Sequence, residues 1–184
     1  MHEQLIAEVV GEIAPQILGR ALGKAWQLGR DALAIDFRLG DGRFLFVSCD
    51  PSRPRLYLVE RRARDLERES QAPAQFLLAL RRRAGGAVVR AVSKDAGERV
   101  VRFAFDAEDE AGRPHSPGLV AQLTGRTANL FLLDDGGRVV ESLRPARGEG
   151  QEAGDVYGPP ARGVANARAD HPGNSAARAG GTGA

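Results

Sequence analysis

The segment SKDAGERVVRFAF, residues 93–105, has the clearest β-strand pattern in this chain. In its second half, large apolar residues alternate with arginine and alanine, which predicts a half-buried strand. These apolar residues are Val101, Phe103 and Phe105. An acid and a base, Glu98 and Arg99, stand side by side at the head of the strand. Because neighbouring residues on a strand point to opposite faces, we do not expect them to form a simple surface ion pair.

Outward from this segment, the sequence predicts a mixture of helices and antiparallel strands. Apolar residues at helical spacing predict a helix over 3–18, which Pro15 is expected to kink or interrupt. A second helix is predicted over 73–86, where three arginines before a glycine stop suit the helix dipole. Strands are predicted as a hairpin over 31–50, about Asp41-Gly42, and over 55–60, 87–93 and 99–105.

The C-terminal half of the chain predicts further short elements and then a change of composition. Residues 106–117 are interpreted as a polar connection. Residues 118–145 predict a short helix, a Gly-Arg turn, a strand, a turn at Gly136-Gly137 and another strand. We therefore predict one α+β domain over 1–160. Residues 161–184 contain no large apolar residue, cannot build a core and are predicted to form a disordered tail.

The charge of the chain is small overall but uneven. The net charge is +2, whereas residues 53–102 hold 13 basic and 6 acidic side chains, a local net charge of +7. Such a segment can attract the phosphates of a nucleic acid. Of the 26 basic residues, 24 are arginine, and the chain is rich in alanine and glycine. The competing interpretation is that this composition reflects the codons of a GC-rich genome and that the arginines only form a solvated surface.

Several kinds of chemistry find no support in the sequence. Cys49 is the only cysteine, which excludes an internal disulfide, fits a cytosolic location and suggests a buried thiol. The three histidines are scattered, so no metal cluster is expected. No run is apolar enough to span a membrane, and we find no phosphate loop, dinucleotide fingerprint or nucleophile elbow. The residues alone thus indicate an α+β domain that binds an anionic polymer or simply carries a basic surface.

The order of five motifs indicates a family. The chain contains a Gly-Arg before a short strand, a Pro-x-x-Phe helix with a basic end, an acid–arginine pair at a strand head, a Leu-x-Gly-Arg-x-x-Asn turn and a Gly-x-x-Tyr-x-x-Pro closure. The matching residues are Gly19, Arg20, Lys24, Gln27, Pro73, Phe76, Arg81, Arg82, Arg83, Glu98, Arg99, Gln122, Leu123, Thr124, Gly125, Arg126, Asn129, Gly154, Tyr157 and Pro160. Over residues 3–160 the chain resembles the N-terminal domain of the NFACT family, ribosome quality-control proteins often labelled fibronectin-binding protein A.

This resemblance implies an α+β fold that is similar to the N-terminal domain of formamidopyrimidine-type DNA glycosylases. Those enzymes use an N-terminal proline as nucleophile, and here the chain begins Met1-His2-Glu3. Without that amine the glycosylase chemistry has no nucleophile. We therefore expect no enzyme activity and no cofactor.

The resemblance also implies a partner. Full-length family members bind the large ribosomal subunit with a stalled nascent chain and recruit tRNA, so the expected partners are tRNA and the ribosomal subunit, in the cytoplasm. The tRNA contacts implied by the motifs are Glu98, Arg99, Gln122, Arg126 and Asn129, with Lys24, Arg81, Arg82 and Arg83 as phosphate contacts. The alternative for Glu98 and Arg99 is a pair that only caps the strand.

Some positions depart from the family pattern and keep other interpretations open. Glu98 stands for Asp, Gln122 for Glu and Thr124 for Met. The family's helix-hairpin-helix, coiled-coil and second NFACT segments do not follow, so a protein partner that supplies them is expected if the chain acts on ribosomes. A truncated or degenerate remnant, a nucleic-acid enzyme and a surface adhesin are the competing hypotheses.

Overall fold

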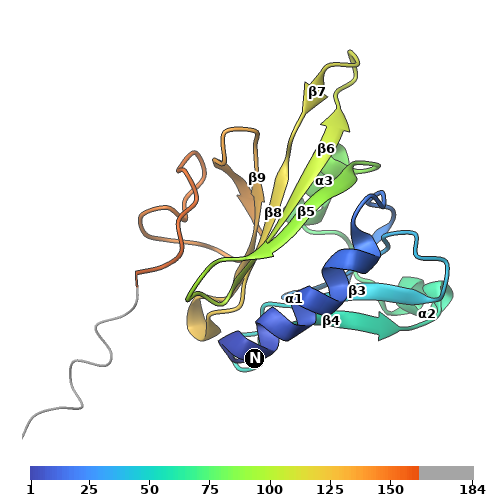
Figure 1. Cartoon of the computed structure of the whole chain (residues 1–184), viewed down its shortest axis with the longest axis horizontal. Coiled ribbons are helices and arrows are strands. Elements are labelled where there is room, and N and C mark those ends of the chain that lie inside the picture. The colour runs from blue at the N-terminus through green and yellow to red at the C-terminus, as the bar shows by residue number, and fades with distance from the viewer. Residues whose placement is uncertain (162–184) are drawn as a thin grey trace, which may run out of the picture.

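The computed structural model describes residues 1–161, and in this part the chain forms two antiparallel sheets with three α-helices (Figure 1). The smaller sheet has the order β1 (Ala25–Gln27), β2 (Ala32–Ile35), β3 (Arg43–Ser48) and β4 (Arg55–Glu60). The larger sheet has the order β10 (Val139–Ser142), β9 (Asn129–Leu133), β8 (Gly118–Gln122), β6 (Val100–Glu108) and β5 (Val88–Lys94), with β7 (Pro114–His115) paired to β6. The helices are α1 (Glu3–Ile17), α2 (Ala63–Glu69) and α3 (Gln75–Ala84), and a 3₁₀ turn, η1, covers Gly125–Thr127.

One main hydrophobic core lies between the two sheets and is flanked by α1 and α3. Alternate residues of each strand point into it, as the period of two requires. Strand β6 contributes Val101, Phe103 and Phe105, and all three are buried, which confirms the strand predicted from the opening segment. Two smaller clusters lie on the outer faces, one against Tyr157 on the larger sheet and one against Leu66 of α2 on the smaller sheet.

Most of the predicted elements are confirmed, and two details are wrong. Helix α1 runs through Pro15 to Ile17 without interruption. Pro15 lies in the last turn, so its missing N–H removes one bond at the place where the helix is about to end. The segment 118–122 is strand β8 and not the predicted short helix. Both faces of this strand are covered, so its sequence lacks the alternation of apolar and polar residues by which a strand is recognised.

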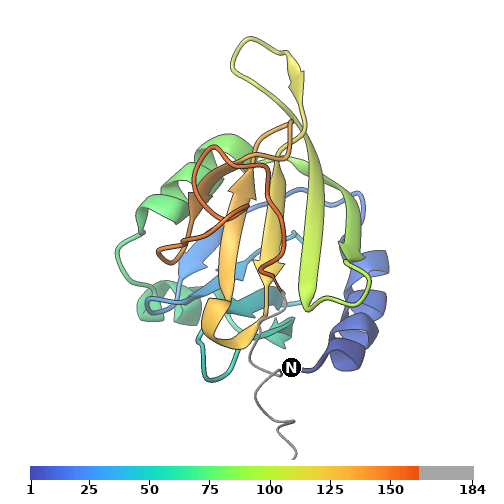
Figure 2. The same cartoon turned by 90° about the vertical axis from the view of Figure 1, so that its left-hand side faces the viewer.

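Two elements lie outside the predicted helices and strands. The β6–β7 hairpin occupies part of 106–117 and extends away from the two sheets, as both views show (Figures 1 and 2). Helix α2 was not predicted, because its seven residues bury only Leu66 and show little periodicity. Among the described residues, no helix is long and apolar enough to cross a bilayer. The predicted disordered tail, apart from Ala161, lies outside the described residues.

Candidate nucleic-acid interface

Glu98 and Arg99 line a cavity of about 410 Å³ at one end of the larger sheet. Its other walls come from Glu3 of α1, Gly97, Thr124, Thr127, Pro160 and Ala161. Both members of the pair therefore face the same space, and the expectation that they point to opposite faces is wrong. The reason is that strand β6 begins only at Val100, while Glu98 and Arg99 belong to the turn before it, where strand alternation does not apply.

Arg99 is placed by backbone contacts rather than by a partner for its charge. Its carbonyl accepts a hydrogen bond of 2.8 Å from the N–H of Leu123, which ties the turn to the end of β8. Arg99 is half-buried, and its guanidinium has no ion pair or side-chain hydrogen bond within residues 1–161. An arginine in this state offers a planar fork of donors to a phosphate or a base.

Lys94 holds the same turn by hydrogen bonds to its backbone and to α1. Its ammonium donates to Glu3 Oε1 at 2.8 Å, to the Asp95 carbonyl at 2.8 Å and to the Glu98 carbonyl at 3.0 Å. Only 12% of the Lys94 side chain is exposed, so these bonds are largely shielded from water. The ion pair offsets the charge of Glu3 in the cavity wall, which lowers the repulsion that a bound anion would meet there.

A chain of polar contacts connects the Glu98–Arg99 turn with the turn at η1. Asp95 accepts two hydrogen bonds from Arg102, at 2.7 and 2.9 Å, and this pairing raises the pKa of the guanidinium. Arg102 lies 5.0 Å from the centre of the Tyr157 ring, and burial raises the pKa of that phenol. The Tyr157 hydroxyl donates to Gln122 Oε1 at 2.8 Å, and Gln122 Nε2 donates to the carbonyl of Thr127.

Two of the residues predicted to contact tRNA are therefore inside the fold. Gln122 is fully buried, and its oxygen and its nitrogen both have partners within the domain. Asn129 is also buried and accepts hydrogen bonds of 2.9 Å from the backbone N–H groups of Leu130 and Arg144. Any effect of Gln122 on RNA would be indirect, through the turns that it holds, whereas Asn129, although buried, is among the residues that line a second cavity beside Arg126.

Arg126, the remaining predicted residue, lines a second and smaller cavity of about 140 Å³. This cavity shares Thr127 and Pro160 with the first, so the two are neighbours. Its lining includes two further arginines, Arg144 and Arg147, and no acidic side chain. Arg126 and Arg147 are exposed and have no ion pair among the described residues.

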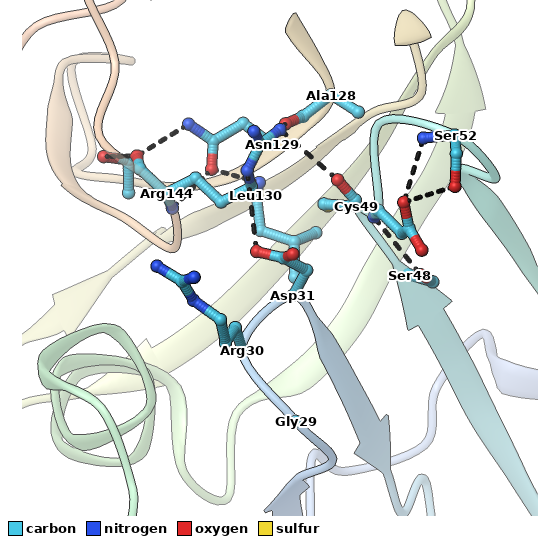
Figure 3. A network of polar contacts seen from close by, with 12 residues as sticks. Gly29, Arg30, Asp31, Ser48, Cys49, Ser52, Ala128, Asn129, Leu130 and Arg144 are labelled. Carbon is cyan, nitrogen blue, oxygen red and sulfur yellow. Dashed lines mark hydrogen bonds and ion pairs between the residues drawn. The ribbon is translucent and has the colours of Figure 1, made fainter. Parts of the chain in front are cut away.

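Arg144 joins three loops beneath this second cavity (Figure 3). Its side chain donates to the Ala128 carbonyl at 2.7 Å and to the Cys49 carbonyl at 3.4 Å, and it lies 3.5 Å from the Asp31 carboxylate. The loops thus come from both sheets, which gives the arginine-lined surface a rigid base. Cys49 itself is buried, which confirms its predicted role, and burial raises the pKa of its thiol to about 12.

The predicted phosphate contacts lie elsewhere. Lys24 and Arg81–Arg83 line neither of these two cavities. Lys24 forms an exposed ion pair with Glu67 and lies over the Trp26 ring, at 5.7 Å from its centre. Arg81 donates to the Ala25 carbonyl at 2.8 Å, so it joins α3 to β1. Together, Lys24 and Arg81–Arg83 are called the α3 patch.

No sequence pattern pointed to Arg144 or Arg147. Neither belongs to a periodic segment or to one of the five motifs, and only the folded chain brings them beside Arg126. Within the described residues no group of acidic, histidine or cysteine side chains is arranged to hold a metal ion.

The fold and the site define a class of protein: an α+β domain of two antiparallel sheets with a concave, arginine-lined surface at one end. The chain belongs to the NFACT family, since a family model described as NFACT N-terminal and middle domains matches residues 4–157. No curated protein matches the sequence.

Several solved structures share the fold. The N-terminal domain of the fibronectin-binding protein PavA from Streptococcus pneumoniae has a TM-score of 0.76 and 18% identity over 86% of this chain and 61% of that one. The fibrinogen-binding protein from Staphylococcus aureus has a TM-score of 0.69 and 17% identity, over 86% of this chain and 56% of that one. The chain thus spans about six tenths of the length of these structures. The expected similarity to DNA glycosylases stays a prediction.

Proposed function

We propose that this chain is a non-catalytic RNA-binding module that holds tRNA at the Glu98–Arg99 cavity and the adjacent arginine surface. The observation that carries the proposal is the state of Arg99. Arg99 lines a cavity, and its guanidinium has no charge partner within the described residues. Its backbone carbonyl accepts a hydrogen bond from the N–H of Leu123, which fixes the main chain at this position. Keeping an unpaired charge half-buried is costly, and a bound phosphate would supply the missing partner.

The arginines around the neighbouring cavity extend this surface. Arg126 and Arg147 are exposed without ion pairs among the described residues, whereas Arg144 beside them is paired with Asp31. Two unpaired cations without an acid in the lining favour a polyanion over a neutral ligand. Glu98 lies in the same cavity as Arg99 and is suited to accept a hydrogen bond from a base amino group or a ribose hydroxyl.

Membership of the NFACT family supports a place for this module in ribosome-associated quality control, in the cytoplasm. In that setting the tRNA would be presented to a large ribosomal subunit that carries a stalled nascent chain. The module would supply the tRNA contact and no bond-making step of its own.

The test is the binding of fluorescently labelled total tRNA to the full chain across a salt series. Arg99→Ala should weaken binding at least tenfold, and Arg99→Lys should recover only part of it, since lysine keeps the charge but loses the planar fork. Arg113→Ala is the matched control, because Arg113 is an exposed arginine of the β6–β7 hairpin and lines neither cavity. Equal binding by all four proteins would reject the proposed site.

A second candidate partner comes from the solved relatives, which are described as binding fibronectin or fibrinogen. The shared fold makes such a partner worth a direct measurement. Immobilised fibronectin and fibrinogen should capture the chain only if this activity is present, and unlabelled tRNA as competitor would show whether the same surface is used.

A further inference from the structure

The outer face of the smaller sheet is covered over only part of its area. Leu66 of α2 packs against Trp26, Ala34 and Phe44 and buries them. The next aromatic residue of β3 on this face, Phe46, remains half-buried. Its partner across β4 is Tyr57, which is 37% exposed. Tyr57 is the only exposed Phe, Tyr or Trp side chain in the described part of the chain.

These two rings and one arginine form a continuous surface. The centres of the Phe46 and Tyr57 rings lie 5.4 Å apart. The guanidinium carbon of Arg55 lies 5.3 Å from the centre of the Phe46 ring, on the same face of the sheet. Beside Tyr57, a cavity of about 200 Å³ opens towards Glu12 and Gln16 of α1. The surface is thus aromatic, partly open and bordered by polar groups.

The charge at this surface is also positive and unpaired. Arg55 and the exposed Arg53 form no ion pair within the described residues, and Arg55 Nε is shielded from water without a hydrogen-bond partner. Two acids lie near this surface: Glu12 lines the cavity beside Tyr57, and Asp50 precedes Arg53 in the chain. Hydrogen bonds from Ser52, at 2.7 Å from its hydroxyl, and then the charges of Arg53 and Arg55 lower the pKa of Asp50, but neither arginine is in an ion pair with it. A polyanion that approached the rings would therefore meet two available guanidinium groups.

We propose that Phe46, Tyr57 and Arg55 form a stacking platform for unpaired bases of an RNA strand. Every base has a π-face that stacks on an aromatic ring, and arginine contributes both stacking and phosphate contact. A peptide without acidic side chains would use the rings alone and leave the arginines unmatched, whereas single-stranded RNA offers a base and a phosphate at every nucleotide and uses both. The platform deepens the proposed function and rests on it, because it names the feature of the RNA, unpaired nucleotides, that this second surface reads.

The platform adjoins the arginine-lined surface. Arg55 pairs with Ser48 across β3 and β4, and the next residue, Cys49, offers its carbonyl to Arg144 beneath the second cavity. The turn at η1 and the loop after β3 lie at the same end of the molecule in both views (Figures 1 and 2). An RNA strand held at Arg99 and Arg126 has a short path to the platform.

The test uses the full chain and a single-stranded twelve-nucleotide oligouridylate that carries one 5-bromouridine. Irradiation should cross-link the RNA to Tyr57 or Phe46, as mapped by mass spectrometry. Tyr57→Leu should weaken oligouridylate binding about fivefold or more, while Tyr57→Phe, which keeps the ring, should bind as the wild type does. A fully paired RNA duplex offers no free base and should bind both variants equally.

The outcomes separate this proposal from the proposed function. If Arg99→Ala abolishes tRNA binding while Tyr57→Leu binds oligouridylate normally and no cross-link reaches the platform, the rings are only a cross-strand packing pair and the platform is overturned. If Tyr57→Leu loses binding and Arg99→Ala does not, the platform stands and the tRNA site fails. If the wild type binds neither tRNA nor oligouridylate, both proposals fail, and capture of a peptide by the rings would overturn the platform in favour of a protein partner.

Discussion

The sequence predicted that both the Glu98–Arg99 turn and the α3 patch contact RNA. In the structure, their basic side chains have different surroundings. Arg99 faces a cavity, is fixed by the backbone and lacks a charge partner among the described residues. Lys24 and Arg81 have partners in Glu67 and the Ala25 carbonyl. Arginine count alone therefore does not locate a binding site. A binding site for an anion is distinguished by a positive charge that lines a cavity and has no partner within the protein.

The largest effect on stability is expected in the hydrogen-bond network beside the Glu98–Arg99 cavity. Tyr157→Phe removes the hydroxyl that Gln122 Oε1 accepts from, and leaves that buried oxygen without a partner. We expect a loss of about 1–3 kcal/mol in the free energy of unfolding, measured by urea denaturation. Tyr57→Phe is the matched control, because its hydroxyl has no hydrogen bond within the described residues. Equal stabilities would show that the network does not support the cavity.

The second prediction uses Cys49, beneath the arginine-lined surface. Burial raises the pKa of its thiol from 9.0 to about 12, so the folded state holds the proton more tightly than the unfolded state. The resulting stability is complete below pH 9 and is lost as the pH rises towards 12. Between pH 8 and pH 10 the wild type should lose about 1 kcal/mol more than Cys49→Ala. Parallel losses would mean that burial does not raise the pKa of the thiol and that Cys49 is accessible to water.

The third prediction compares pairs of arginines. Arg126 and Arg147 line the second cavity, whereas Arg82 and Arg83 are exposed on α3. The Arg126→Ala/Arg147→Ala double variant should lower tRNA affinity about tenfold and reduce the dependence of log affinity on log salt by about 1–2. The Arg82→Ala/Arg83→Ala variant should change affinity less than twofold. The reverse order would locate the RNA at the α3 patch.

The smallest effect is expected at Lys24. Its ion pair with Glu67 is about half exposed on both sides, at 55% and 50%. Exposed pairs contribute about 0–1 kcal/mol, so Lys24→Ala should alter the unfolding free energy by less than about 1 kcal/mol and leave tRNA binding unchanged. A clear loss of tRNA binding would return Lys24 to the set of RNA contacts.

The sequence predicted those parts of the fold that show apolar alternation or lie between clear turn signals. Strand β9, for example, is buried throughout but is bounded by the Gly125-Arg126 and Gly136-Gly137 turns. The alternation at Val101, Phe103 and Phe105 located β6, and the Asp41-Gly42 turn located the β2–β3 hairpin. Strand β8 was missed because both its faces are covered, and α2 because it is short. Periodicity carries no signal in either case.

The site was predictable only in part. The acid–arginine pair and the Gly-Arg turn drew attention to Arg99 and Arg126, which the structure places at neighbouring cavities. Glu98 and Arg99 line the same cavity because β6 begins only after them. Gln122 and Asn129 are buried because of their contacts with Tyr157 and Arg144. Such contacts join residues far apart in the chain, so no local pattern reveals them.

RNA bound at the Glu98–Arg99 cavity would protect other backbone amides than RNA bound at the α3 patch. Hydrogen–deuterium exchange of the full chain, with and without saturating tRNA, distinguishes the two because it reports position as well as binding. We expect slower exchange over residues 95–99 and 123–128 and no change over 80–86. Protection confined to 80–86, or no protection in either segment while tRNA is bound, would show that RNA does not bind at this cavity.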